Sequence, residues 1–310
     1  MAAITAKDVA ALRAKTGIGM MECKKALVEA EGDMEKALKV LRERGLAVAA
    51  KKEGRIAADG VVEILKEGDV SAMIEVNSET DFVAKNATFR EFVTSLLKTI
   101  IAAKPADIDA LLAAKYLDTD LCVNDKLKEM IFQIGEKINI RRFVVVNGVT
   151  STYVHGGGVA GVIVGFDTTA EVAATEKFAK MAKNVALQIA SGNPPTYITR
   201  EDVPASVLAE EKAIQIAAMK NDPKNANKPE NILEKIVVGK LGKYYEQVCL
   251  DEQQFFLDDD LTVGKYIANT AKELGADIKV REFHLYEKGE GIEKREDNFA
   301  DEIAKLTHQG

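Results

Sequence analysis

The sequence predicts an α+β fold, in which antiparallel strand hairpins are backed by helices, behind a small N-terminal unit of three helices. Two observations carry this prediction. A strand hairpin followed by a loop and a long amphipathic helix occurs twice, about 90 residues apart. Hairpins backed by helices are typical of α+β proteins rather than of doubly wound parallel sheets. The first 45 residues instead show helical spacing that glycines interrupt.

Capping residues and glycines set the ends of the first two helices. Thr5 followed by Asp8 has the spacing of a capping box and starts a helix. The glycine turn at residues 17–19 ends that helix, and residues 20–31 resume the helical spacing. Met20 and Met21 stand at the mouth of this turn, where a small core cannot bury both. They therefore either contribute to the core or form part of a binding surface, for which methionine is well suited.

A third helix and a linker complete the N-terminal unit. Asp33 is an N-cap residue, and the apolar spacing that follows it predicts a helix that ends near Gly45. Residues 46–59 are alanine-rich and then charged. We expect these residues to form a linker at the first domain boundary.

The first half of the following core is predicted to contain three strands and three helices. The strands span residues 61–65, 70–76 and 141–146, and the helices span residues 86–103, 110–114 and 125–134. Glu67, Gly68 and Asp69 supply turn chemistry between the first two strands, which therefore form a hairpin. Residues 77–82 are expected to be a loop between this hairpin and the long helix.

The second half repeats this order weakly, which favours an internal duplication. Its strands are predicted at residues 151–155, 159–166 and 276–283, and its helices at residues 169–190, 202–219, 229–245 and 296–306. A polar loop joins the helices at 202–219 and 229–245. These two helices are expected to form an antiparallel hairpin that projects from the body.

Composition and charge exclude several classes of protein. The chain has 310 residues and a net charge of −7, which argues against a nucleic-acid coat protein. Residues 1–59 hold 12 Lys and Arg against 9 Asp and Glu, or +3, so the remainder carries −10. No apolar run approaches the ~18 residues of a membrane helix. The N-terminus shows no secretory signal or obvious transit peptide. We expect a cytoplasmic protein without a membrane partner.

Motifs for catalysis or metal binding are weak. Residues 156–161 match G-x-G-x-x-G, but a strand-like run follows the glycines where a dinucleotide site needs a helix N-terminus. A hairpin turn is therefore expected, with a nucleotide-dependent oxidoreductase as the alternative. His155 lacks a partner motif, and Asp258, Asp259 and Asp260 are expected to form a solvated acidic turn rather than a cation site. Three scattered cysteines and three lone histidines predict neither disulfides nor zinc.

Residues 80–86 are the most informative local feature. The segment places Phe82 in a polar loop between a strand and a long helix. Such a phenylalanine is suited to protrude and fill a pocket of a partner protein. The alternative is that Phe82 folds back as a loop plug.

Residues 77–86 (NSETDFVAKN) resemble the signature of the elongation factor Ts family, the guanine-nucleotide exchange factors of elongation factor Tu. Four further segments resemble this family in the same order along the chain. They are residues 12–27 with Glu31, Gly32 and Asp33, residues 135–142, residues 153–156 and residues 289–294. The resemblance therefore covers essentially the whole chain.

The resemblance implies a domain organisation. A three-helix domain like a ubiquitin-associated module is expected at residues 1–54. A duplicated core is expected at residues 55–147 and 148–290, with a helical-hairpin insertion at about 194–245. A C-terminal helical module is expected at residues 291–310. A general adaptor, in which the three-helix domain binds ubiquitin-like proteins, remains an alternative.

The resemblance also implies a function without covalent chemistry. The chain is expected to form a transient complex with elongation factor Tu, insert Asp81 and Phe82 near the partner's magnesium site, and release GDP so that GTP can reload. The other implied contact residues are Thr80, Val83, Met20, Met21, Ile134, Gly135 and His155. No cofactor of its own is expected, because the partner binds magnesium and GDP or GTP. A 2:2 complex is a possible higher assembly, and no direct contact with nucleic acid is expected.

Overall fold

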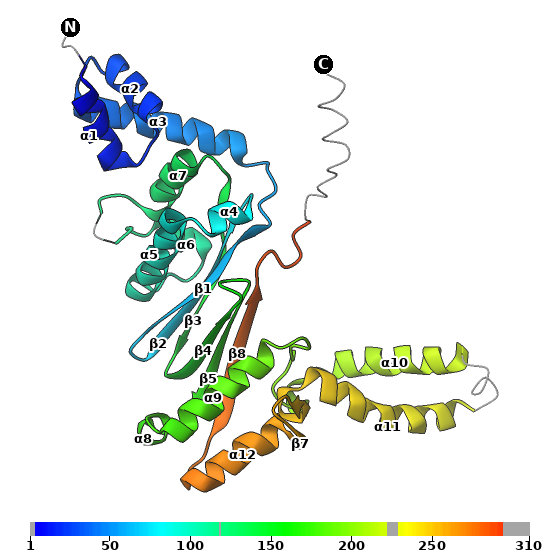
Figure 1. Ribbon diagram of the computed structural model, residues 1–310. Helices are drawn as coiled ribbons and strands as arrows, with labels where there is room; N and C mark the ends of the chain where they lie inside the picture. Colours follow the sequence, from blue (N-terminus) through cyan, green and yellow to red (C-terminus); the bar gives the residue numbers. More distant parts are fainter. Residues whose placement is uncertain (1–3, 118, 222–228, 294–310) are drawn as a thin grey trace.

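The computed structural model of the chain describes residues 4–117, 119–221 and 229–293. It is a mixed helix and antiparallel-sheet structure, as the sequence predicts. Figure 1 shows the N-terminal helices at one end, two sheets in the middle and a pair of helices projecting sideways. No helix within the described ranges is long and apolar enough to cross a membrane.

The N-terminal unit consists of α1 (Ala6–Thr16), α2 (Met20–Glu29) and α3 (Met34–Lys52). The predicted caps form, since Asp8 N–H donates to Thr5 Oγ1 at 3.2 Å and Glu35 N–H donates to Asp33 Oδ1 at 2.9 Å. Leu12, Leu27 and Leu41 are buried in the small core between the helices. This core is completed from outside the unit by Phe132 of α7 (Val123–Ile134).

The predicted end of α3 at Gly45 is wrong, and so is the first part of the predicted linker. The helix continues to Lys52. Gly45 is buried against Phe132, where a Cβ on the glycine would lie 3.5 Å from the Phe132 Cβ. Alanine, which has the highest helix propensity, is frequent in residues 46–50. Packing on α7 and local propensity therefore both extend the helix past the glycine.

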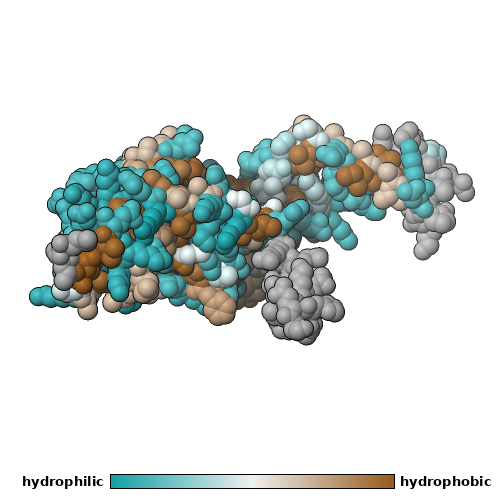
Figure 2. All heavy atoms as spheres, turned by 90° about the horizontal axis from the view of Figure 1, so that it is seen from above, coloured by the Kyte–Doolittle hydropathy of each residue, from teal (hydrophilic) through white to brown (hydrophobic). Residues whose placement is uncertain are grey.

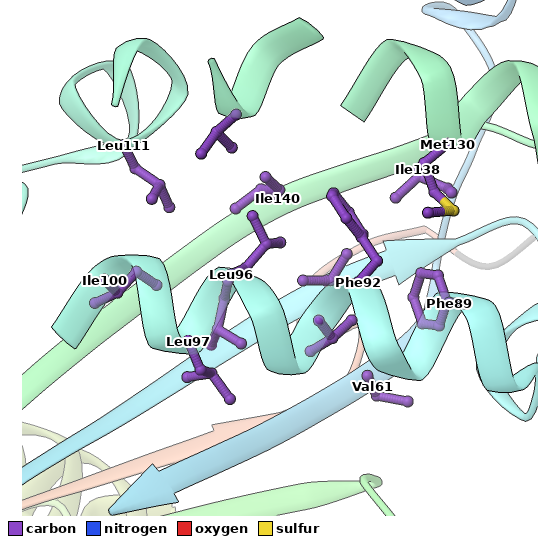
Figure 3. Packing of buried hydrophobic residues seen from close by; sticks show 14 of the residues in the cluster. Val61, Phe89, Phe92, Leu96, Leu97, Ile100, Leu111, Met130, Ile138 and Ile140 are labelled. Atoms are coloured by element: carbon purple, nitrogen blue, oxygen red, sulfur yellow. The ribbon is translucent and has the colours of Figure 1, made fainter. Parts of the chain in front are cut away.

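The first sheet contains β1 (Asp59–Glu67), β2 (Val70–Ser78) and β3 (Ile138–Asn147), all antiparallel, in the order β1-β2-β3. The long helix α5 (Ala87–Ala103) covers one face of this sheet, with α6 (Ile108–Ala113) and α7 beside it. Figure 3 shows Phe89, Phe92 and Leu96 of α5 packed above the strands. These side chains are buried and form the largest apolar cluster of the chain's described part.

The second sheet contains β4 (Val149–His155), β5 (Ala160–Asp167) and β8 (Lys279–Glu287) in the order β4-β5-β8. The predicted helix at 169–190 is two helices, α8 (Ala170–Ala173) and α9 (Glu176–Ile189). Thr175 separates them because its hydroxyl accepts from Phe178 N–H at 3.2 Å and caps α9. The two sheets contact each other through Val62, Met73, Val146 and Ile163.

Residues 246–275 carry no element in the sequence prediction, yet four begin there. These are the 3-10 helix η2 (Leu250–Glu252), β6 (Gln254–Phe255), β7 (Asp258–Thr262) and α12 (Val263–Leu274). The predicted acidic turn is wrong, because Asp258, Asp259 and Asp260 lie in β7, where they remain exposed. Tertiary packing decides this region, since α12 lies against α9 and stacks Tyr266 on Phe255 at 4.1 Å between ring centroids.

The predicted helical hairpin is formed by α10 (Ala205–Asn221) and α11 (Glu230–Val248). Met219, Leu233 and Val237 are buried between the two helices. Figure 2 shows this hairpin extending away from the body. Part of the polar loop at its tip and the predicted terminal helix at 296–306 lie outside the described residues.

Candidate functional site

The segment at residues 80–86 is a short helix rather than the predicted loop. Asp81–Ala84 forms α4, and Thr80 caps it by accepting from Val83 N–H at 3.5 Å. Asn86 ends the segment by capping α5, since its side chain accepts from Thr88 N–H at 2.9 Å. A capping residue on each side therefore confines α4 to a single turn.

α4 buries one side and exposes the other. Val83 and Ala84 are buried in the core under the helix. Phe82 points the opposite way and is 80% exposed. The loop-plug alternative is therefore wrong, and Phe82 is a protruding aromatic side chain on a helix that its neighbours hold in place.

Glu136 fixes the start of α4 from a distant part of the chain. Its carboxylate accepts from Thr80 N–H at 3.0 Å and from the Thr80 hydroxyl at 2.7 Å. A second hydrogen bond joins the same two segments, because the Glu79 carboxylate accepts from Lys137 N–H at 2.5 Å. The beginning of α4 is thus tied to the junction of α7 and β3. Sequence reasoning gave Glu136 no role, although it follows a helix-ending glycine.

Ile134 and Gly135 form that junction. Gly135 ends α7 with a φ of +83°, a left-handed conformation that favours glycine. Ile134 lines an open hollow together with Phe82 of α4 and Gly17 of the turn between α1 and α2. Three regions that the sequence predicts to contact a partner are therefore adjacent. They are the turn between α1 and α2, the helix α4 and the end of α7.

Met20 and Met21 begin α2, three residues beyond the hollow's Gly17. They are 40% and 65% exposed, so the surface alternative for these residues is supported over the core alternative. Neither methionine lines the hollow that contains Phe82. They add two exposed apolar side chains close in sequence to Gly17, which lines the hollow.

His155 ends β4 and is exposed, with its Nδ1 2.9 Å from the Tyr153 hydroxyl. Arg90 of α5 connects this region to α4. Its Nε donates to the Ala84 carbonyl at 2.7 Å, and its Nη2 donates to the Gly157 carbonyl in the turn after His155. A further bond at 2.8 Å joins Arg90 to Glu63 of β1. Arg90 therefore orients the His155 turn relative to α4, a role that the sequence did not indicate.

The glycines at 156–158 form a hairpin turn, as expected. All three have positive φ, between +57° and +107°, and strand β5 follows them. No helix N-terminus follows the glycines to hold a pyrophosphate, so this segment lacks the dinucleotide geometry that the oxidoreductase alternative requires.

Asp81 carries a charge beside Phe82. Lys85 donates to the Asp81 carboxylate at 2.6 Å, and this hydrogen bond lowers the pKa of Asp81 below its ordinary value of 3.8. The positive charge of Lys288 acts in the same direction. The exposed ion pair contributes little to stability. It favours the ionised form of Asp81.

The arrangement is suited to binding a protein rather than to covalent chemistry. It presents an aromatic side chain and an ionised carboxylate on α4 and two exposed methionines on α2. Among the residues that the structure describes, no group of three or more His, Cys, Asp or Glu side chains is placed to hold a metal ion.

Comparison with known proteins identifies one family. The profile of the family described as Elongation factor TS matches residues 79–290. The chain is 45% identical over 307 residues to Elongation factor Ts of Syntrophotalea carbinolica, covering 98% of this chain and 99% of the relative. It is 47% identical over 309 residues to Elongation factor Ts of Clostridioides difficile, with 98% and 99% covered. The chain therefore belongs to the elongation factor Ts family of translation elongation factors.

Proposed function

We propose that the chain promotes release of GDP from elongation factor Tu through a transient complex in which Asp81 and Phe82 enter the partner near its magnesium site. GDP and magnesium are then held less tightly, and GTP can reload. The observation that carries this proposal is Phe82, which is 80% exposed on a helix fixed by Thr80 and Glu136.

The energetic requirement is differential binding. The factor accelerates release only if it binds the nucleotide-free partner better than the GDP-bound partner, and the coupling is reciprocal. Each tenfold increase in release rate needs about 1.4 kcal/mol. A phenylalanine that buries ~150–250 Å² at ~25 cal/mol per Å² supplies at most about 4–6 kcal/mol. Binding costs reduce that figure, so Phe82 contributes the largest share and Met20, Met21 and the core supply the rest.

Preorganisation supports the role of Phe82. A side chain on a mobile loop loses conformational entropy when it is inserted, which reduces the affinity. The caps and the Glu136 contacts have already fixed the backbone of α4. More of the burial energy of Phe82 is therefore available to change the partner.

The remaining predicted residues extend the same interface. We assign Met20, Met21, Ile134, Gly135 and His155 to partner contacts, with Thr80 and Val83 supporting the inserted pair. Their support is adjacency to α4, directly for Ile134 and through Arg90 for the His155 turn. The partner supplies the magnesium and the nucleotide, and the complex acts in the cytoplasm. A 2:2 assembly is the proposed higher state.

The domain organisation implied by the family is proposed with this function. It comprises a ubiquitin-associated-like domain at 1–54, a duplicated core at 55–147 and 148–290 with the hairpin insertion, and a C-terminal module at 291–310. The duplication is supported by the two three-stranded antiparallel sheets, each backed by a long helix, α5 and α9.

Release of a fluorescent GDP analogue from elongation factor Tu tests this function. The wild-type chain is expected to accelerate release strongly, and Phe82→Ala is expected to lose most of the acceleration. Phe256→Ala removes a phenylalanine that is 45% exposed elsewhere on the surface and serves as the matched control. Lack of acceleration by the wild-type chain would refute the exchange function. Equal acceleration by wild type and Phe82→Ala would leave the function and exclude Phe82 from its mechanism.

A further inference from the structure

Residues 287–291, here called the strap, comprise the last residue of β8 and the turn after it, and they cross between the two halves of the core. Lys288 N–H donates to the Val159 carbonyl at 2.8 Å, next to the β4–β5 turn. Gly289 passes so close to β1 that a Cβ on it would lie 2.3 Å from the Ala58 carbonyl oxygen. Only glycine fits this approach, since its φ is also +70°.

The buried carboxylate of Glu75 holds the strap. Glu75 lies in the middle of β2 with no exposed surface, and it accepts from Gly289 N–H at 2.8 Å. Arg141 and Arg142 of β3 donate to the same carboxylate at 3.0 and 2.7 Å. Burial opposes ionisation, but these hydrogen bonds and one from Asn77 outweigh it and lower the pKa of Glu75. The strap is thus one of the groups that stabilise a buried charge.

Arg142 fastens the strap from the side. Its Nη2 donates to the Glu287 carbonyl at 3.2 Å and to the Glu290 carboxylate at 2.9 Å. Its guanidinium also lies over the Tyr286 ring, 4.1 Å from the centroid. Arg142 therefore binds the buried Glu75 carboxylate through its Nε and the strap residues Glu287 and Glu290 through its Nη2.

Lys288 brings the strap to the proposed exchange site. Its Nζ is 2.6 Å from the Asp59 carboxylate, which begins β1. α4 packs on β1 and β2, so Asp59 lies at the start of a strand that supports the helix. Lys288 is also close enough for its charge to act on Asp81. The strap is therefore linked to α4 through Asp59 and β1, a route that does not involve Lys85 or Glu136.

We propose that the strap is a positioning element for α4, and that Lys288 is the positioning residue through which it acts. A segment near the C-terminal end of the described chain then sets the rigidity and charge environment of Asp81 and Phe82. The inference rests on the proposed exchange function for its consequence, whereas the positioning itself is a property of the free chain.

The test measures amide hydrogen exchange of the free full-length chain and GDP release at saturating factor in the same variants. Lys288→Met is expected to reduce protection at residues 79–85 and to lower the maximal release rate about fivefold, which corresponds to about 1 kcal/mol. Lys288→Arg keeps the Asp59 contact and is expected to recover most of the protection at residues 79–85 and most of the release rate. Lys177→Met removes another inter-element ion pair, with Glu273, and serves as the matched control.

A second variant tests the strap's path. Gly289→Ala introduces a Cβ against the Ala58 carbonyl and is expected to give the same two effects as Lys288→Met. Unchanged protection at residues 79–85 in Lys288→Met, or an equal loss in Lys177→Met, would overturn the proposal. If the wild-type chain fails to release GDP, the proposed function fails, and hydrogen exchange alone then decides whether the strap positions α4.

Discussion

Glu136 accepts hydrogen bonds from both the backbone N–H and the hydroxyl of Thr80, which lies 56 residues earlier in the chain. The contact joins the end of one helix to the beginning of another. It converts the strand-to-helix connection after β2 into a fixed support for Phe82. The rigidity of this support is the basis of the first prediction.

Removing the Glu136 carboxylate should weaken exchange more than it weakens the fold. Glu136→Ala is expected to lower stability by about 1–3 kcal/mol, because part-buried donors of Thr80 lose their acceptor. Release of GDP should fall several-fold at saturating factor. Urea unfolding and nucleotide release measure the two effects. Glu129→Ala, which removes a carboxylate from α7, the helix that ends two residues before Glu136, should change neither by a comparable amount. Exchange as fast as wild type in Glu136→Ala would contradict the account.

Arg90 should couple α4 to the His155 turn. Arg90→Met keeps much of the aliphatic stem but loses the bonds to the Ala84 and Gly157 carbonyls and to Glu63. We expect lower affinity for elongation factor Tu, because the two contact regions are no longer held together. Titration calorimetry with the nucleotide-free partner measures this affinity. Arg90→Lys should recover only part of it, since lysine cannot form the forked contacts. Unaltered affinity in Arg90→Met would show that the two regions act separately.

Glu75 predicts a dependence of stability on pH. Its pKa is lowered in the folded chain from an ordinary value of 4.5. A lowered pKa contributes stability that is present above the unfolded value and lost as the pH falls through the folded value. Glu75→Gln should therefore cost about 3 kcal/mol at pH 7, and the difference from wild type should shrink below about pH 4.5. Urea unfolding at pH 7 and at several pH values below 4.5 measures this difference. A constant difference across this range would exclude the charge as its cause.

Two glycines should respond in opposite directions to alanine. Gly45 lies inside α3, and an added Cβ would meet Phe132 at an ordinary 3.5 Å. Gly45→Ala should therefore stabilise the chain by about 0.5–1 kcal/mol. At Gly161 the added Cβ would lie 2.7 Å from Val62 Cγ1 between the sheets. Gly161→Ala should destabilise by about 1–3 kcal/mol. Thermal unfolding of both variants checks the signs, and destabilisation by Gly45→Ala would contradict the packing of α3 on α7.

Local signals predicted much of the fold. The Thr5–Asp8 capping box, the Asp33 cap and the hairpin turn at Gly68 depend on neighbouring residues, and all three form. The end of α3 and the element α12 depend instead on distant packing partners, Phe132 and the α9 face. Sequence periodicity carries no information about these partners, which explains why both were predicted incorrectly or not at all.

The same distinction applies to the candidate site. Phe82, Met20 and Met21 stand out in the sequence because large apolar residues occur among polar ones or beside a turn. Glu136, Arg90 and Lys288 do not stand out, because their roles arise from contacts with residues far away in the sequence. The partner residue is 56 positions from Glu136, 67 positions from Arg90 at Gly157, and 229 positions from Lys288. Candidate contact residues could thus be named from the sequence, whereas the groups that hold their backbone in place required the structure.

The most direct measurement is the affinity of the chain for elongation factor Tu in its nucleotide-free and GDP-bound forms, for wild type and for Phe82→Ala. The ratio of the two dissociation constants is the coupling between factor and nucleotide. Wild type should bind the nucleotide-free form far more tightly, and Phe82→Ala should reduce this ratio by about tenfold or more while retaining measurable affinity. An identical ratio in both proteins would contradict the account, because Phe82 would then bind both forms equally and could not drive GDP release.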